Sequence, residues 1–462
     1  MRHQRRDDYW KPGSVCEDFS RIKAAVYAVS GWGDSYSRNV LALLEGLSSP
    51  KKALIGPWSH GWPHLARPGP AIGFMQEALR WWDHWLKGID TGIMDEPMLR
   101  VWMQDWIAPA KSVEHWPGRW VAQTRWRPER AQPQILALTR EGLREALPVQ
   151  ALGLSLCSPQ NLGLSAGYQC SYGLGPDLSD DQSADDALSL CFDGEPLPAR
   201  MEILGEAVLE LELSSDKPQA LLAARLCDVA PDGSSLRLGY GLLNLSHRDG
   251  SAEPVPLLPG QNYTLRLPLC AMAHALAPGH RLRLALSTGY WPIAWPSPEA
   301  VTLKVSSGRL LLPVRTPNPA LDDVLPAFGE PEGAAPHALV ETRPRSPARL
   351  LDRIEQGSET GRVDLVRERD RGAWRTSDTD VAYDTRGELR FSIDPADPLS
   401  ARQSIELSTD MGRPGWQVRT EVSTTLSCTK DSFVIQTQLQ AFEGVEPVFS
   451  GAWTSSIRRD NM

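Results

Sequence analysis

From about Trp120 onward, the chain is a series of short segments in which apolar and polar residues alternate. Turn residues such as Pro-Asp-Gly at 231–233 and Pro-Gly at 259–260 separate these segments. A period of two places successive side chains on opposite faces of a strand. Short strands at regular spacing with little helix are typical of a jelly roll or a related β-sandwich, which we expect over residues 121–316. Examples are AVLELELSS, LRLGYGLLNL, YTLRLPLC and HRLRLALST.

The last part of the chain predicts a second β unit. Residues 317–350 are rich in Pro, Ala and Arg and indicate a linker. Alternation then resumes in GELRFSID, WQVRTEVSTTLSC and FVIQTQLQAF, so residues 351–462 are expected to form a small antiparallel β extension. Large β surfaces of this kind are compatible with a homodimer.

Residues 1–120 have a different character, because strand-like and helical patterns alternate there. The apolar run Ala24–Gly31 precedes a segment with helical spacing, and a second run, KKALIGPW, precedes the clearest helix, GFMQEALRWWDHWLKG. Strand, helix, strand, helix indicates an α/β layer with parallel strands. Only two strands are evident, and two parallel strands cannot bury both faces, so the unit is expected to be incomplete. The candidates for the helix's apolar face are Phe74, Leu79, Trp82, Trp85 and Leu86.

Composition excludes several classes of function. The net charge of -9 comes from 48 basic and 57 acidic residues spread along the chain, which argues against nucleic-acid or anionic-membrane partners. Seven cysteines without a C-x-x-C pair predict reduced, mostly buried thiols rather than disulfides or a zinc site. The N-terminal residues have no apolar h-region, and no segment resembles a membrane span. We expect a cytoplasmic protein without a cofactor.

Two polar residues each follow a strand-like segment. Asp34 lies in GWGDSYS after the first run, and His60 lies in GPWSHGWP after the second. Carboxyl ends of neighbouring parallel strands lie at one edge of a sheet, where an Asp can orient a His that acts as a general base. Taken singly, each residue is more simply a turn aspartate or a loop histidine, but together the two motifs favour an acid–base pair.

The order and context of Asp34 and His60 match the last two positions of an α/β-hydrolase triad, which runs Ser, acid, His. GWGDSYS, GPWSH, EALRWWDHWLKG and EPMLRVWM resemble the C-terminal part of the catalytic domain of CocE/NonD-type acyl hydrolases. RLCDVAPDGSSLRLGYGLLNLSHR and PGHRLRLALSTGYWP resemble the family's jelly-roll, galactose-binding-like domain. The resemblance implies that Asp34 is the triad acid and His60 the base. It also implies an ester or X-Pro peptide substrate. The residue patterns themselves indicate no cofactor and no metal.

The nucleophile is where this sequence departs from the family. Only 33 residues precede Asp34, and they contain no Gly-x-Ser-x-Gly, so the chain is expected to be N-terminally truncated and inactive by itself. GLSAG at 163–167 matches the pattern formally, with Ser165 at its centre. No helical pattern follows it, and it lies in the β-rich region, so a loop is the simpler interpretation.

Two other groups of residues give weaker predictions, one of a metal site and one of a substrate pocket. His60 and His64 have a zinc-like spacing, but Gly61 and Pro63 between them argue against a helix. The tryptophans nearest the acid–base pair, Trp32, Trp58 and Trp62, are candidates for a substrate pocket, with core packing as the alternative. A different function also stays open, namely a non-catalytic β-sandwich binding or structural protein with a remnant hydrolase domain.

Overall fold

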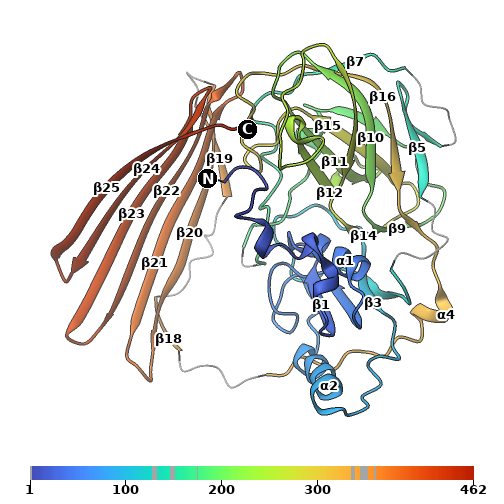
Figure 1. The fold of residues 1–462 in the computed structure, drawn as a ribbon. Coiled ribbons are helices and arrows are strands. Elements are labelled where there is room, and N and C mark those ends of the chain that lie inside the picture. The colour runs from blue at the N-terminus through green and yellow to red at the C-terminus, as the bar shows by residue number, and fades with distance from the viewer. Residues whose placement is uncertain are drawn as a thin grey trace.

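The computed structural model describes residues 3–126, 133–145, 151–173, 175–333, 339–343, 352–357 and 361–461. Figure 1 shows three parts: an N-terminal unit that carries the helices α1 and α2, a pair of packed sheets above it, and a large sheet of long strands beside both. The first part is a mixed α/β sheet, and the other two are antiparallel, as the alternation patterns predicted.

The first sheet contains seven strands in the order β1-β2-β3-β14-β9-β17, with β4 also paired to β3. Pairing is parallel from β1 through β3 to β14 and antiparallel elsewhere. The expectation of only two strands was wrong, because residues 1–120 also contain β3 and the start of β4. Strands from farther along the chain then extend the sheet. The strands are β1 (Val26–Gly31), β2 (Lys51–Gly56), β3 (Leu99–Asp105), β4 (Gly118–Gln123), β9 (Met201–Gly205), β14 (Met272–Leu276) and β17 (Val314–Arg315).

Two helices accompany this sheet. Helix α1 (Ser37–Gly46) buries Val40, Leu41 and Leu44 and packs on β1 and β2. Helix α2 (Phe74–Lys87) ends at Gly88, whose φ of 70° is the left-handed conformation that favours glycine at a helix end. The remaining short helices are α3 (Ser183–Asp186), α4 (Pro319–Asp322), η1 (Lys11–Gly13), η2 (Val15–Glu17), η3 (Phe19–Arg21) and η4 (Leu245–His247).

The expected orientation of α2 was wrong. Leu79, Trp82 and Leu86 are exposed, at 56%, 52% and 75%. The helix buries Glu77 and Trp81 instead. Tyr27 causes this orientation, because its hydroxyl donates to the Glu77 carboxylate at 2.9 Å and its ring packs against Trp81.

Two antiparallel sheets pack face to face in the middle of the molecule and share one large aliphatic core. In β10, Leu209, Leu211 and Leu213 point into this core, whereas Glu210 faces outward and pairs with arginines on β13 and β16. The strands of one sheet are β13 (Asn262–Pro268), β10 (Val208–Ser215), β16 (Leu303–Leu312), β5 (Gln134–Thr139), β6 (Gly142–Glu145) and β7 (Leu154–Leu156). Those of the other are β12 (Ser235–Asn244), β11 (Leu221–Val229), β15 (Arg281–Ser287) and β8 (Leu190–Asp193). The jelly-roll topology stays a prediction.

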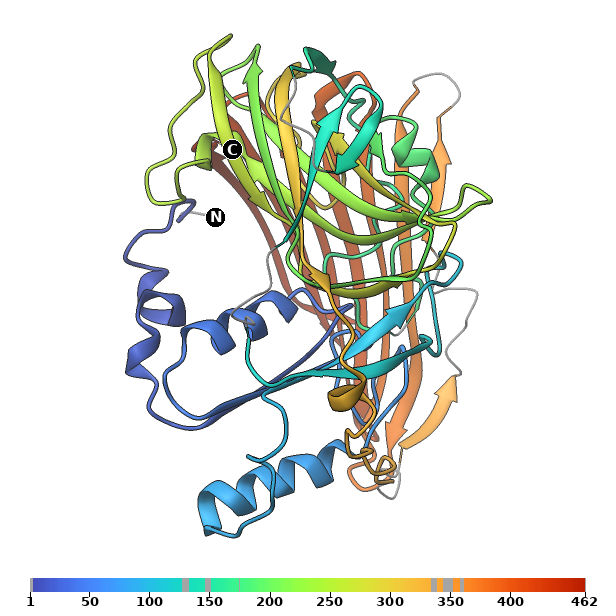
Figure 2. The same ribbon diagram turned by 90° about the vertical axis from the view of Figure 1, so that its right-hand side faces the viewer.

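The C-terminal sheet has eight strands, and β20 to β25 are joined in sequence as hairpins. Leu365, Phe391 and Ile393 pack against Trp291 of the sandwich. The view in Figure 2 places this sheet behind the sandwich, with α2 at the lower end of the molecule. The strands are β18 (Leu339–Arg343), β19 (Asp352–Gln356), β20 (Val363–Thr376), β21 (Ala382–Asp394), β22 (Asp397–Arg413), β23 (Trp416–Cys428), β24 (Ser432–Glu443) and β25 (Glu446–Arg458).

Two further observations complete the fold. Within the described ranges, no helix combines the length and apolarity needed to cross a bilayer. All seven cysteines are free, and the prediction that most are buried was wrong. Three of them are exposed (Cys16, Cys157 and Cys270), three are partly exposed (Cys170, Cys191 and Cys428), and only Cys227 is buried.

Candidate active site

Asp34 lies in the loop after β1. Its Oδ1 accepts a hydrogen bond from the backbone N–H of Tyr36 at 3.0 Å, and its Oδ2 accepts one from the Ser30 hydroxyl at 3.3 Å. The side chain is only 10% exposed. These donors fix the carboxylate in one orientation, which is what a residue that positions a second side chain requires.

His60 lies in the loop after β2, the strand that pairs in parallel with β1. Its backbone N–H donates to the carbonyl of Ser171 at 2.7 Å. Its ring is 44% exposed and lies between Tyr36 and Tyr172, with centroid separations of 5.7 and 5.4 Å. The loop therefore holds the backbone firmly and leaves one edge of the ring accessible.

The structure brings these two residues together, with 3.1 Å between His60 Nδ1 and Asp34 Oδ2. A carboxylate on Nδ1 favours the tautomer in which Nε2 is free to accept a proton. Across the ranges the structure describes, Nε2 has no hydrogen-bond partner. The arrangement is thus an oriented imidazole whose reactive nitrogen is available to a group supplied from elsewhere.

The segment around residues 168–177 covers this pair, and sequence reasoning missed its role. Ser171 connects both loops, because its N–H donates to the Gly33 carbonyl and its carbonyl accepts from His60. Asp177 closes the segment by accepting from the Ser171 hydroxyl at 2.9 Å and from the Tyr172 N–H at 2.7 Å. The sequence showed only a turn-rich stretch, and no local pattern signals a contact with a histidine more than a hundred residues away.

The three candidate pocket tryptophans lie in different environments. Trp32 lines a cavity of about 320 Å³ that also includes Asp34, and its indole donates to the carbonyl of Trp102. Trp58 is 1% exposed and belongs to a core cluster. Trp62 is 67% exposed and packs beside Phe74. Trp32 is therefore the one whose position suits a ligand in this cavity.

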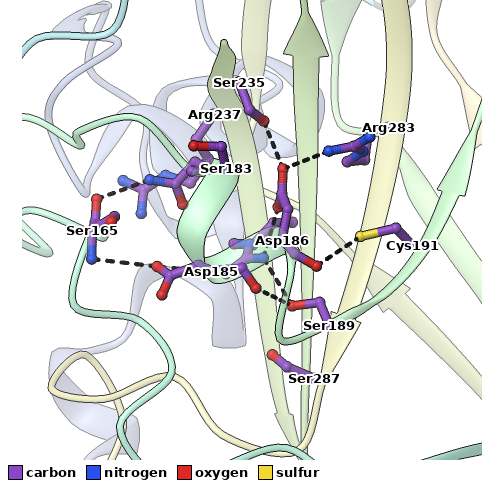
Figure 3. Close-up of polar contacts among 12 residues, drawn as sticks. Ser165, Ser183, Asp185, Asp186, Ser189, Cys191, Ser235, Arg237, Arg283 and Ser287 are labelled. Atoms are coloured by element: carbon purple, nitrogen blue, oxygen red, sulfur yellow. Dashed lines mark hydrogen bonds and ion pairs between the residues drawn. The ribbon is translucent and has the colours of Figure 1, made fainter. Parts of the chain in front are cut away.

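Ser165 has a structural role in its loop (Figure 3). Its N–H donates to Asp185 Oδ2 at 3.3 Å, and its carbonyl accepts from Gln182 at 2.9 Å. The serine lies in a turn and not between a strand and a helix. Among the described residues no hydrogen bond joins it to His60 or Asp34, so its surroundings are those of a loop rather than of a nucleophile elbow.

The network beside Ser165 is built from buried charges (Figure 3). Asp186 accepts from Arg225, Ser235 and Arg283 at 2.8, 2.7 and 3.2 Å. Burial raises the pKa of the neighbouring Asp185 carboxyl, although Arg225 opposes that shift. Buried ionic groups of this kind hold α3 onto the sheet formed by β11, β12 and β15.

The comparisons with known proteins match the N-terminal segment and the central part of the chain to two family models. Residues 91–346 match the family described as the X-Pro dipeptidyl-peptidase C-terminal non-catalytic domain, and residues 1–62 match the X-Pro dipeptidyl-peptidase (S15) family. A predicted serine esterase of Mycobacterium bovis is 27% identical over 344 residues, covering 67% of this chain and 52% of the relative. Cocaine esterase of Rhodococcus is 23% identical over 309 residues, with 63% and 53% covered.

Solved structures show a similar fold. A CocE/NonD family hydrolase from Staphylococcus aureus superposes with a TM-score of 0.51 at 14% identity, covering 67% of this chain and 57% of that one. The chain thus spans about half the length of the curated relatives it matches.

Proposed function

Because the chain belongs to the CocE/NonD and S15 X-Pro dipeptidyl-peptidase family, we propose that it supplies the acid and the base of a serine acyl hydrolase. The 3.1 Å contact between His60 and Asp34 supports this proposal most directly. His60 takes the proton of a serine hydroxyl as the acyl-enzyme forms and returns it to the leaving group, while Asp34 stabilises the imidazolium. The substrate is an ester or an X-Pro-type amide.

The nucleophile in this proposal comes from a polypeptide segment other than the described residues. Within those residues, His60 Nε2 has no hydroxyl partner, and the hydrogen bonds of Ser165 join its backbone to its own loop rather than to His60. A hydrolase that lacks its nucleophile loses the covalent route and keeps only weak residual catalysis. We therefore expect the isolated chain to be inactive.

Trp32 contributes to the substrate pocket in this proposal. It lines the same cavity as the triad acid, together with Tyr168 and Tyr240. Aromatic walls with a few polar groups are typical of small-molecule sites. In a polypeptide that also carries the serine, Trp32→Ala should raise KM, whereas an unchanged KM would exclude Trp32 from the pocket.

The rival function, a non-catalytic binding protein, has one observation in its favour. The polar face of the C-terminal sheet carries a groove of about 540 Å³, lined by residues that include Glu368, Arg386, Glu406 and Glu421. A groove of this composition would suit a polar or cationic partner. In that case the acid–base pair would be a remnant.

Fluorophosphonate labelling tests the first proposal. The reagent modifies a serine that a working base activates, so the purified chain should show no added mass. A label on one serine that disappears in His60→Ala would place the nucleophile within this chain, and Ser165 is the first position to map.

A second experiment separates the two functions. The transcript upstream of the Met1 codon is sequenced, and any longer in-frame polypeptide is purified. An elbow serine that labels in the longer protein, and fails to label in its His60→Ala and Asp34→Asn variants, supports the hydrolase. The control is His3→Ala, because His3 forms a similar pair with Asp7, 2.7 Å apart, at an exposed position. No label in the longer protein would favour the binding function.

A further inference from the structure

A thiol lies beside the acid–base pair. Cys170 Sγ is 4.0 Å from Asp34 Oδ1, with the thiol as the donor. One sulfur, one imidazole nitrogen and one carboxylate oxygen, from Cys170, His60 and Asp34, all lie within 4.8 Å of one another. The three residues come from three loops, and Cys170 lies 136 residues from Asp34, so the tertiary fold brings the thiol to the pair.

We propose that these three side chains bind a divalent cation of the Zn²⁺ class, with one coordination position open to solvent. Thiolate, imidazole and carboxylate are the three ligand types that zinc takes in proteins. Sulfur selects against Mg²⁺ and Ca²⁺, which prefer oxygen ligands. Three protein ligands plus a water molecule make a four-coordinate site, and the exposed edge of the His60 ring gives that water access to solvent.

The distances are close to those of a bound ion. Bond lengths of 2.0–2.3 Å around tetrahedral zinc place neighbouring ligand atoms roughly 3.5 Å apart. His60 Nδ1 and Asp34 Oδ2 are 3.1 Å apart already. The Cys170 sulfur is 4.0 Å from the other carboxylate oxygen, Oδ1, and the three ligand atoms lie within 4.8 Å of one another. Metal binding therefore requires the sulfur to approach by about half an ångström to somewhat more than an ångström, a shift on the scale of a side-chain rotation.

The surroundings hold all three ligands in place. Ser171 follows Cys170 directly, and its backbone bonds to Gly33, which precedes Asp34, and to the backbone N–H of His60. Ser30 and the Tyr36 N–H orient the Asp34 carboxylate. Donors of this kind, one step removed from a metal, fix the ligands' geometry and raise affinity.

Charge and protons balance on binding. The Cys170 thiol loses its proton to solvent as its sulfur bonds to the metal, and neutral His60 moves its proton from Nδ1 to Nε2. One thiolate and one carboxylate then neutralise a doubly charged ion. Binding occupies the atoms by which Asp34 orients His60, so a metal at this site would withdraw the pair from hydrolysis. The inference thus goes beyond the proposed function and does not depend on a nucleophile.

Titration of the purified chain with Co²⁺ alone tests the site. Cobalt in a sulfur-containing tetrahedral site gives a thiolate charge-transfer band and intense visible absorption, and we expect both at one ion per chain. Zn²⁺ should then displace the bound Co²⁺ and remove its visible absorption. Cys170→Ser should abolish the charge-transfer band, His60→Ala should weaken binding by at least about tenfold, and Cys157→Ser, at an exposed cysteine, should change neither.

Thermal unfolding provides a second readout. Zn²⁺ should raise the Tm of the wild type and of Cys157→Ser, because ligands that bind only the folded state stabilise it, and should leave Cys170→Ser unchanged. If Cys170→Ser does not fold, Asp34→Asn replaces it and should lower the affinity for cobalt and the rise in Tm with Zn²⁺, because it removes the carboxylate ligand. A cobalt band that survives in the Cys170 variant, or that Cys157→Ser also removes, would overturn the proposal. Neither of these two measurements uses fluorophosphonate labelling. The metal-site proposal and the hydrolase proposal can therefore each fail without the other.

Discussion

A Cβ atom on Gly31 would lie 2.0 Å from the carbonyl oxygen of Trp58. Gly31 ends β1 and Trp58 follows β2, so this contact brings together the two loops that carry Asp34 and His60. A side chain at Gly31 would force the loops apart. Glycine at position 31 is therefore required for the geometry of the site as well as for the sheet.

Gly31→Ala should destabilise the protein by roughly 3 kcal/mol, because the added methyl group overlaps a backbone atom that cannot move independently. Gly13→Ala is the matched control, since nothing lies within 4 Å of a Cβ there. Urea unfolding compares the two. Equal midpoints for Gly31→Ala and the wild type would show that the two loops separate at little cost.

Asp186→Ala should cost about 3–5 kcal/mol in the free energy of unfolding. Arg225 and Asp186 are 1% and 2% exposed, so removal of the carboxylate leaves a buried cation without its closest partner. Arg266→Ala is the control, because Arg266 is 64% exposed in its pair with Glu210 and such pairs contribute about 1 kcal/mol or less. Similar losses in the two variants would contradict the buried-charge account.

Asp352 should make the free energy of unfolding depend on pH. Burial raises the pKa of its carboxyl to about 6, against the opposing effect of Arg367. Between about pH 4 and 6 the folded protein keeps a proton that the unfolded chain has released, so stability falls as the pH rises through this window. Relative to Asp352→Asn, the wild type should lose up to about 3 kcal/mol across it. Chemical denaturation of both proteins at several pH values measures the difference. Plots of unfolding free energy against pH that run parallel for the two proteins would contradict the prediction.

The free thiols should react at very different rates. Burial raises the pKa of Cys227 to about 12, and the side chain is fully enclosed, whereas Cys16 and Cys157 are exposed. The lower thiolate fraction alone slows Cys227 by about a thousandfold. Iodoacetamide labelling with peptide mapping should modify Cys157 in the native protein and Cys227 only after denaturation. Labelling of both at one rate in the native state would contradict the core packing around β11.

The sequence was informative where a pattern is local. Asp34 and His60 each follow an apolar strand, and the parallel pairing of β1 and β2 brings the two side chains together as predicted. The long alternating segments likewise predicted the antiparallel sheets. In each case the signal lies within one segment or in the ends of two adjacent strands.

What the sequence did not show depends on distant contacts. Strand β14 joins β3 in parallel although some 170 residues separate them, and Cys170 lies beside Asp34 across 136 residues. The orientation of α2 was missed because one hydrogen bond from Tyr27 draws Glu77 inward and leaves the apolar side outside. Periodicity locates an apolar face and does not say whether anything covers it.

The two kinds of sheet also differ in when they can form. The hairpins of β20 to β25 pair neighbours in sequence, so each closes soon after it is synthesised. The mixed sheet needs β14, β9 and β17 before its order is complete, and the site's covering segment lies near residue 170. Asp34 and His60 leave the ribosome before these strands, so the two residues reach their final environment only after the strands that complete the sheet have been made.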